Sequence, residues 1–389
     1  MDIQKNGQGF LRENLHGNAA FCSFVPTPLQ KLAPFDIQDE TLRLLTTCSR
    51  RLGELEGMLH FVPNADMYLA MYVRKEALLS AQIEGTQCTF DDIIDPERSE
   101  LIKKDVADVV SYVRASDYAI TRLQTMPLCT RFLREVHEIL LSGTRGSDKT
   151  PGETRVSQNW IGPAGCAIAG ATYIPPNIED MNEALSELDK FINEPPKDID
   201  PIIRAALIHY QFETIHPFLD GNGRLGRLLI TLSLMNDGVL THAGFYPSYQ
   251  LKLKRHEYYE RLMDVRREGL FEEWIAFFCE CMLESADDAV ASLKSLISLH
   301  DANVAIINKQ MGRLAANGQR LLELLEGNPI VNIAFVSDKL GVSRTTAANL
   351  VNAFVDEGIL VALDESRQRY RVFLYESYLA ILRKGDEPL

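Results

Sequence analysis

Residues 216–227 read His-Pro-Phe-Leu-Asp-Gly-Asn-Gly-Arg-Leu-Gly-Arg, and no other stretch of the chain constrains its local fold as tightly. The residues before it have the apolar spacing of one face of a buried helix, at Ile203, Ala206, Leu207 and Tyr210. The same spacing resumes afterwards, at Leu225, Leu228, Leu229 and Leu232. Pro217 disfavours helical dihedral angles at His216, so the first helix should end there. The sequence therefore predicts a helix, a short loop and a second helix beginning near Gly223.

The predicted loop has the composition of an anion-binding site. Gly221, Asn222 and Gly223 tolerate positive φ angles, so successive backbone N–H groups can point into one concavity. The second helix directs the positive end of its dipole at the same place. Arg224 and Arg227 lie one helical turn apart and can both reach one anion, and their planar guanidinium groups suit phosphate oxygens.

Two further side chains supply chemistry beside this concavity. His216 is predicted at the negative end of the first helix, where a histidine keeps or raises its affinity for protons, so it can serve as a general base. Asp220 offers a hard oxygen ligand that could hold Mg²⁺ against two phosphates. Each feature alone has an ordinary explanation as a helix end or a turn. Their combination predicts a site for the phosphates of a nucleotide.

The segment resembles the signature of the Fic family, whose members mostly transfer AMP from ATP to a hydroxyl of a protein side chain. The match is complete at His216, Pro217, Phe218, Asp220, Gly221, Asn222, Gly223, Arg224 and Arg227. The resemblance implies that His216 takes the proton from a Tyr, Thr or Ser hydroxyl that attacks the α-phosphorus. It also implies that Asp220 holds Mg²⁺, while Asn222, Arg224 and the loop amides bind the leaving pyrophosphate.

Two other parts of the nucleotide site follow from the same resemblance. In the family, the segment before a Pro-Pro pair is a short β-hairpin flap that holds the target side chain, and the pair here is 175–176. The resemblance thus places four flap residues beside ATP, namely Gly170, Ala171, Thr172 and Tyr173. It puts a tyrosine that contacts adenine near Tyr258, although Arg266 stands where some relatives have asparagine.

A second motif lies upstream, where residues 80–85 read Ser-Ala-Gln-Ile-Glu-Gly and end a helical stretch with Gly85 as its cap. Glu84 falls in the last turn, where the helix field disfavours a carboxylate by roughly 0.3–1 kcal/mol, so it either pairs with a cation or tolerates that cost. Ser80, Glu84 and Gly85 match the inhibitory helix of many Fic proteins. By resemblance, Glu84 pairs with Arg227 and occupies the place of the γ-phosphate. In some members this glutamate helps to remove AMP, so the direction of transfer stays open.

The expected fold is mainly α. An N-terminal helical region over 1–110 carries the inhibitory helix, the helical Fic core with its flap spans 111–285, and a connecting helix follows over 286–314. The last part, 315–389, is predicted as a winged helix-turn-helix domain. Within it, helices are expected over 334–340 and 344–357, and strands over 359–363 and 370–373 on either side of a polar tip at 364–369.

This C-terminal domain supports a rival hypothesis, a transcriptional regulator that uses the Fic-like core as a nucleotide sensor. From 337 to 384, however, seven basic residues stand against six acidic ones, and a net charge near +1 gives little counterion release on binding DNA. Protein docking is therefore favoured over DNA binding. A third alternative, a phosphotransferase, fits less well because the family's kinase-like variants have degraded glycine loops.

Composition limits the partners further. With 54 acidic and 40 basic residues among 389, the net charge of −14 argues against general affinity for nucleic acid or anionic membranes. The N-terminus has no signal-peptide pattern, and no apolar run approaches the ~18 residues of a bilayer span. The seven cysteines show no metal-binding spacing. We expect a soluble cytoplasmic protein whose partner is a protein hydroxyl, its own included, and whose association as a homodimer stays open.

Overall fold

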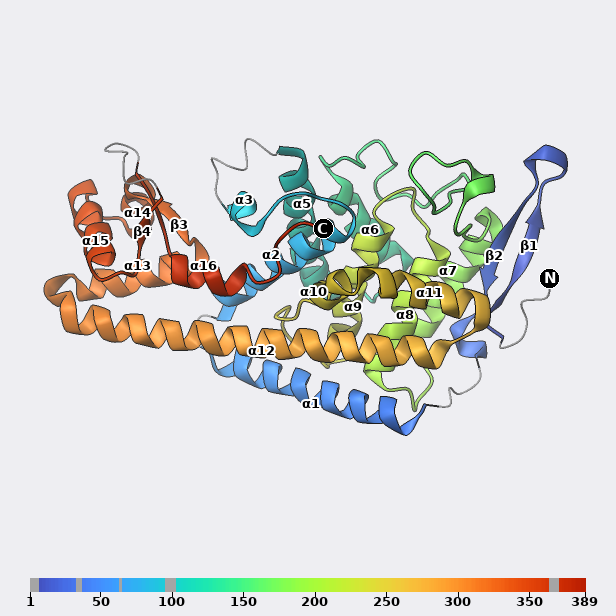
Figure 1. Cartoon of the computed structure of the whole chain (residues 1–389), viewed down its shortest axis with the longest axis horizontal. Helices are drawn as coiled ribbons and strands as arrows, with labels where there is room; N and C mark the ends of the chain where they lie inside the picture. The colour runs from blue at the N-terminus through green and yellow to red at the C-terminus, as the bar shows by residue number, and fades with distance from the viewer. Residues whose placement is uncertain (1–6, 33–36, 63–64, 95–102, 364–370) are drawn as a thin grey trace.

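Helices make up most of the computed structural model, which describes residues 7–32, 37–62, 65–94, 103–363 and 371–389 (Figure 1). The larger helices are α1 (Asp39–Phe61), α2 (Ala65–Ile83), α5 (Lys103–Leu123), α6 (Thr130–Leu141), α7 (Ile178–Asn193), α8 (Pro201–Ile215), α9 (Asn222–Asn236), α11 (Arg255–Glu268), α12 (Phe271–Gln310), α13 (Ala315–Gly327) and α15 (Arg344–Asp356). The shorter ones are α3 (Phe90–Ile94), α10 (Ser248–Leu253), α14 (Ile333–Leu340) and α16 (Glu376–Leu382). The predicted mainly α fold is confirmed.

Within the described residues, the region over 1–110 that was expected to be helical starts with a β-hairpin, and its helices follow from residue 39 onward. Strand β1 (Gly9–Asn14) pairs antiparallel with β2 (Phe21–Pro26), and the pair projects at one end of the molecule in Figure 1. The free edge of β2 is fixed by a hydrogen bond from the Phe24 N–H to the Ile174 carbonyl at 3.0 Å. This strand depends on a partner distant in sequence, which a search for helical periodicity does not detect.

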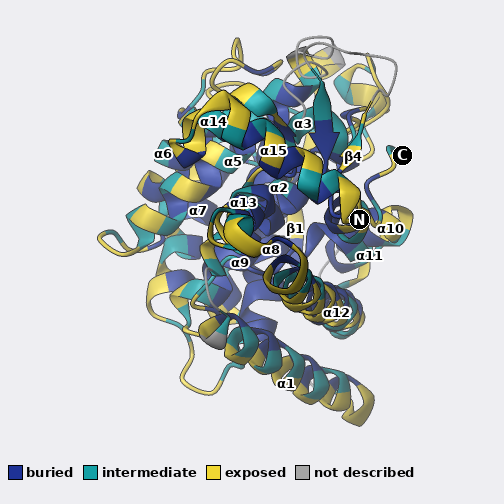
Figure 2. Cartoon of the chain, turned by 90° about the vertical axis from the view of Figure 1, so that its left-hand side faces the viewer, coloured by how far each residue is buried: buried dark blue, intermediate teal, exposed yellow. Residues whose placement is uncertain are grey.

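Helices α8 and α9, which flank the predicted anion-binding loop, form the centre of the core. Every residue of α8 after its first is buried, and most of α9 is buried as well, as the dark interior of Figure 2 shows. The buried Trp274 of α12 donates a hydrogen bond from its ring nitrogen to the Ala206 carbonyl at 3.0 Å, which ties α8 to the longest helix. The loop therefore stands on two helices that cannot shift without disturbing the core.

Helix α12 is 40 residues long and runs along α1 for much of the molecule (Figure 1). Thr41 donates to Glu272 at 2.5 Å, and Lys294 lies 2.8 Å from Glu54, so the two helices are parallel. The expected boundary between 285 and 286 falls inside this helix, and the connecting helix is its continuation. Within the described residues, α12 is also the helix whose length and hydropathy would suit a membrane span, yet its buried side chains pack against the protein core.

The C-terminal unit joins α13 to α16 with a small antiparallel sheet of strand order β3-β5-β4. The helices expected over 334–340 and 344–357 are present as α14 and α15. The strand-like runs are shorter than expected, as β4 (Val361–Ala362) and β5 (Val372–Leu374), and β3 (Ile330–Asn332) was not foreseen. The expected polar tip at 364–369 lies outside the described residues.

The last residues of the chain return to the core and bind the end of helix α2. The buried Lys252 ammonium donates to the Gly385 carbonyl at 2.9 Å and to the side-chain oxygen of Gln82 at 2.6 Å. The Gln82 amide in turn donates to the Asp386 carbonyl at 2.6 Å. These buried polar groups satisfy one another, so the tail and α2 form one hydrogen-bonded unit.

The close packing of this tail predicts an asymmetry between two glycines. Gly385 (φ +81°) and Gly238 (φ +72°) both have left-handed backbone, but a Cβ at Gly385 would lie 2.2 Å from the Tyr249 ring, whereas a Cβ at Gly238 meets nothing within 4 Å. Gly385→Ala should therefore cost about 1–3 kcal/mol more of unfolding free energy than Gly238→Ala, because only the first overpacks. Thermal melts of the two variants would measure this, and equal melting temperatures would contradict the docked tail.

Candidate active site

The loop between α8 and α9 has the predicted form. Helix α8 ends at Ile215, and His216 follows in a left-handed conformation with φ 50° and ψ 59°. Gly221 has φ +77°, and α9 begins at Asn222. A non-glycine residue with positive φ is strained and persists only where its surroundings hold it. The reversal at His216 places the imidazole at the C-terminal end of α8, next to the N-terminus of α9.

Arg155 and Asn159 hold this strained backbone from outside the loop. The Arg155 N–H donates to the Pro217 carbonyl at 2.9 Å, and its guanidinium donates to the His216 carbonyl at 3.1 Å. The Asn159 amide donates to the carbonyls of His216 at 3.3 Å and Phe218 at 3.0 Å. The sequence alone does not reveal these two roles, because they depend on a fold that brings 155–159 beside 216–218.

The imidazole of His216 is held in its neutral form. Burial and the nearby guanidinium groups of Arg266 and Arg155 together lower the pKa of His216 to about 4. The expectation that the end of a helix would keep or raise this pKa is wrong, since desolvation and two nearby cations outweigh the helix dipole. A neutral imidazole is nevertheless the form that a general base requires.

Glu84 and Arg227 form an ion pair across the site. The fully buried Arg227 guanidinium lies 2.7 Å from a carboxylate oxygen of Glu84 and also donates to the Ser80 hydroxyl at 2.9 Å and to the Ser80 carbonyl at 3.0 Å. Desolvation acts to raise the pKa of Glu84, but the charge and the hydrogen bond of Arg227, together with the charge of Arg224, outweigh it and hold that pKa below its usual value. Gly85 has φ +93° and ends the turn, as expected.

The carboxylate of Glu84 lies directly over the start of helix α9. A Cβ built on Gly223 would be 2.2 Å from the nearer Glu84 oxygen, so only glycine leaves room for this approach. The N-terminus of a helix is where an anion binds best, because the first backbone N–H groups and the dipole face it. Glu84 thus stands as an anion within the concavity that the sequence predicts for phosphates.

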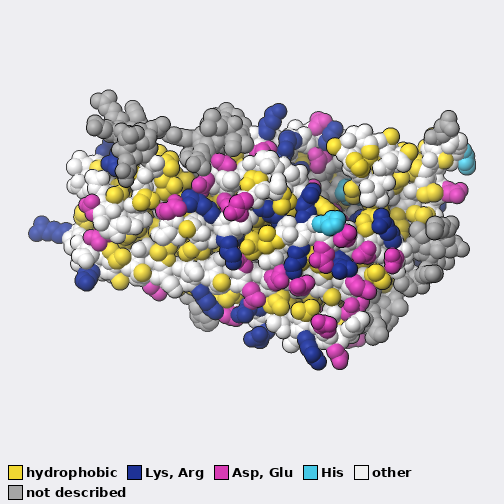
Figure 3. Space-filling view, viewed as in Figure 1, with side chains coloured by type: hydrophobic (Ala, Val, Ile, Leu, Met, Phe, Trp, Pro, Cys, Tyr) yellow, Lys and Arg dark blue, Asp and Glu magenta, His cyan; other side chains and the backbone are white. Residues whose placement is uncertain are grey.

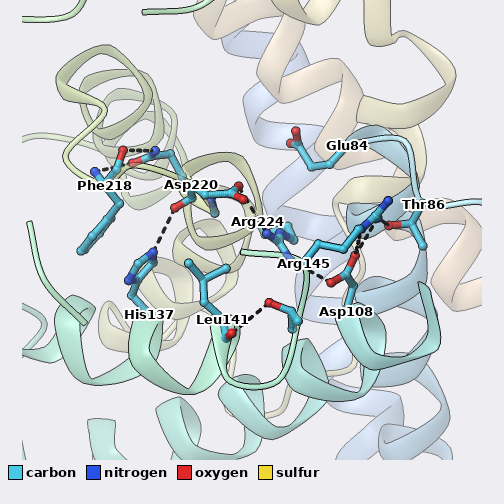
Figure 4. A network of polar contacts seen from close by, with 12 residues as sticks. Glu84, Thr86, Asp108, His137, Leu141, Arg145, Phe218, Asp220 and Arg224 are labelled. Carbon is cyan, nitrogen blue, oxygen red and sulfur yellow. Dashed lines mark hydrogen bonds and ion pairs between the residues drawn. The ribbon is translucent and has the colours of Figure 1, made fainter. Parts of the chain in front are cut away.

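Arg224 is paired with two aspartates, and Figure 4 shows it between Asp220 and Asp108. Its guanidinium lies 3.5 Å from the Asp220 carboxylate and 3.8 Å from that of Asp108, which also binds Arg145 at 2.6 Å. In this structure the two arginines of the motif are thus paired with different carboxylates, Arg224 with Asp220 and Asp108 and Arg227 with Glu84. The charges of both act on the Glu84 carboxylate.

Two further loop residues differ in their exposure, because Asn222 is buried and Asp220 is half-exposed. Asn222 is buried, and its side chain accepts from the Phe218 N–H at 2.9 Å and donates to the Phe218 carbonyl at 2.8 Å, so it shapes the loop from within. Asp220 is half-exposed and accepts from the Gly221 N–H at 2.6 Å. A single accessible carboxylate suits Mg²⁺, which commonly binds through one or two carboxylates together with substrate phosphates.

The expected flap contains less β-structure than predicted. A single antiparallel bridge joins Ile161 to Tyr173, and Gly170 closes a turn of 3₁₀-helix, Ile168–Gly170. Gly170 and Thr172 are exposed and Ala171 partly so. The Tyr173 ring is buried below the Arg266 guanidinium, and its hydroxyl donates to the Thr214 carbonyl at 2.6 Å. Its side chain therefore anchors the flap to α8 and does not line an open surface.

Tyr258 does not occupy the position expected for an adenine contact. Its ring is fully buried, and its hydroxyl lies 2.9 Å from the ring nitrogen Nε2 of His209. The neighbouring Tyr259 is 37% exposed, with the Arg255 guanidinium 5.3 Å from its ring centre. Two adjacent tyrosines on a helix point in different directions, and the sequence alone does not tell which one faces the core.

Comparisons with known proteins find a family and relatives with similar sequences. The model of the Fic/DOC family matches residues 127–234, and that of the N-terminal region of the family matches residues 42–121. The protein adenylyltransferase Fic of Drosophila ananassae is 28% identical over 192 residues, which cover 49% of this chain and 34% of that protein. The protein of the same name from Drosophila willistoni is 28% identical over 262 residues, covering 66% and 47%.

A solved structure supports the fold. The crystal structure of a Fic family protein from Desulfovibrio desulfuricans G20 has a TM-score of 0.55 at 17% identity, and the match covers 88% of this chain and 97% of that one. The two matched segments contain Glu84 and the loop between α8 and α9. It spans between a third and a half of the length of the curated Drosophila relatives.

The depressed pKa of His216 predicts how its ring titrates. In the folded protein the imidazole should stay neutral from pH 7.5 down to pH 5.5, because its pKa lies near 4. Nuclear magnetic resonance of ¹⁵N-labelled histidine side chains would follow this, with His216→Asn identifying the signal. A midpoint between pH 6 and 7 for that signal would contradict the electrostatics of the site.

Proposed function

We propose that this protein is an autoinhibited protein adenylyltransferase, which moves AMP from ATP to a Tyr, Thr or Ser hydroxyl of a protein. The observation that carries the proposal is the position of Glu84, whose carboxylate lies over the N-terminus of α9 and binds Arg227 at 2.7 Å. An anion supplied by the protein itself stands where the outer phosphate of a nucleotide would bind. The Glu84 side chain would therefore block both the binding of that phosphate and the reaction that depends on it.

The reaction needs one bond to form and one to break. The target hydroxyl oxygen bonds to the α-phosphorus, the bond from that phosphorus to the oxygen bridging the α- and β-phosphates breaks, and pyrophosphate leaves. His216 accepts the hydroxyl proton, and because its Nδ1 atom is buried, Nε2 is the nitrogen that receives it. Most of the rate enhancement then comes from holding the nucleophile and the phosphates in line.

The loop stabilises charge on the phosphates during this transfer. Asp220 would hold Mg²⁺, which neutralises phosphate oxygens, and the backbone N–H groups at the start of α9 complete the anion site. Arg224 and Arg227 belong to the first turns of α9, and each is paired with a carboxylate in this structure. A bound triphosphate would replace those carboxylates as the partner of at least Arg227.

The target is proposed to be a protein, the chain's own hydroxyl groups included. Three apolar side chains beside the His216 loop are exposed, namely Val156, Trp160 and Ile161. Exposed apolar groups next to a reactive site suit the docking of a polypeptide. On the face shown in Figure 3, acidic and basic side chains are mixed and no extended basic field is present, so DNA regulation remains the less favoured alternative.

Removing the inhibitory carboxylate should activate the enzyme. Glu84→Gly should raise AMP transfer by about tenfold or more, because a carboxylate no longer competes for Arg227 and phosphate oxygens can bind there instead. Intact-mass spectrometry after incubation with ATP and Mg²⁺ would detect the added AMP. Glu357→Gly is a matched control, since Glu357 is also an exposed glutamate at a helix end followed by a positive-φ glycine.

The same mass measurement separates the alternatives. Addition of phosphate instead of AMP would replace the proposal by a phosphotransferase. Unchanged or lower AMP transfer in Glu84→Gly would remove the inhibitory role of that residue while leaving the activity itself in place.

Removing the general base should separate chemistry from binding. His216→Ala in the Glu84→Gly background should lower AMP transfer by about a hundredfold or more, the usual size of a general-base contribution. ATP affinity, measured by calorimetry, should change little because the phosphate contacts remain. His256→Ala, at a histidine whose side chain is 91% exposed, serves as the control. Full transfer by the His216 variant would exclude this mechanism.

A further inference from the structure

A buried histidine outside the motif contacts the catalytic loop from below. His137 lies on α6 and is fully buried, and both of its ring nitrogens are hydrogen-bonded to backbone. Nδ1 accepts from the Gly152 N–H at 2.9 Å, and Nε2 lies 3.0 Å from the Asp220 carbonyl oxygen. Figure 4 shows the ring directed at that carbonyl.

These two contacts leave one tautomer. A backbone N–H can only donate, so the Nδ1 atom that faces Gly152 carries no hydrogen. A carbonyl can only accept, so the Nε2 atom that faces Asp220 carries one. His137 is therefore neutral, protonated on Nε2, and donates to the backbone of Asp220, a residue proposed to hold Mg²⁺.

The ring also fixes the loop through packing. It stacks on Phe218 with ring centres 3.8 Å apart and an angle of 13° between the planes. A Cβ on Gly221 would come within 3.4 Å of the His137 Nε2 atom, so the loop passes close over the ring. His137 thus contacts the loop at Phe218, Asp220 and Gly221. Through its bond to the Gly152 N–H it also links the loop to the segment that precedes the flap.

We propose that His137 is a positioning residue for AMP transfer, which fixes the backbone of Asp220 and thereby the direction of its carboxylate and of the following loop amides. The inference rests on the proposed function, because it assumes that Asp220 carries Mg²⁺. The donor on Nε2 is the part of the ring that performs this task. The Nδ1 atom accepts from the Gly152 N–H, which keeps the hydrogen on Nε2 and joins the loop to Gly152.

Two substitutions in the Glu84→Gly background separate the donor from the acceptor. His137→Gln can keep a donor near the Nε2 position, whereas His137→Asn can keep only an acceptor near Nδ1. His137→Asn should lose about 10- to 100-fold in kcat and need more Mg²⁺ for half-maximal rate, as expected when an outer partner of a metal ligand is lost. His137→Gln should retain most of the kcat and the Mg²⁺ requirement of the parent.

Two readouts do not depend on turnover. Calorimetry with a non-hydrolysable ATP analogue should show that Mg²⁺ strengthens binding in the parent and in His137→Gln but much less in His137→Asn. Nuclear magnetic resonance of ¹⁵N-labelled histidine at pH 7 should show His137 protonated on Nε2. Melting temperatures of both variants report any general loss of packing.

The outcomes distinguish this inference from the function on which it rests. No AMP transfer by Glu84→Gly alone would overturn the proposed function, while the resonance and binding experiments would still test His137. Equal losses in the Gln and Asn variants, in proportion to their melting temperatures, would reduce His137 to a packing residue. Protonation on Nδ1 would overturn the proposal directly.

Discussion

The buried guanidinium of Arg227 sets the condition that the rest of the site must meet. A fully desolvated cation needs an anion within reach, and here it is supplied by Glu84, 143 residues earlier in the chain. The same place lies at the N-terminus of α9, which favours negative charge on its own. A negative charge at this place is therefore favoured both with and without a bound nucleotide. Whether that anion is a side chain or a phosphate is the difference between the resting and the active state proposed here.

The chemistry of the site depends on a backbone that is held in place before any ligand arrives. His216 adopts a strained left-handed conformation, and Arg155 and Asn159 bind its carbonyl from one side. Asn222 closes the loop on Phe218 from within, and His137 supports it from below. Because three of these four residues are buried (Arg155, Asn222 and His137), the reactive atoms keep their directions without being ordered by the substrate.

Contacts between distant parts of the chain fix the position of Glu84, just as they fix the loop at 216–221. The end of helix α2, just before Glu84, is bound by the C-terminal tail through Gln82 and Lys252. Helix α12 runs without interruption from the helical core to Gln310, and a short 3₁₀ helix, Gly312–Leu314, joins it to α13. A contact between residues 82 and 386 is invisible in the sequence, because no local pattern records which distant backbone will satisfy a buried amide.

The sequence by itself determined what local rules govern: the two helices around residues 216–227, the positive-φ glycine between them, and a mainly α fold. Resemblance to a family supplied the partnership of Glu84 with Arg227, which spacing could not give. Tertiary structure alone decided the rest. The tertiary structure lowers the pKa of His216 through burial and through the charges of Arg266 and Arg155. It also buries the ring of Tyr258 in the core. Electrostatic and packing effects sum over all neighbours in space, and most of those neighbours are far away along the chain.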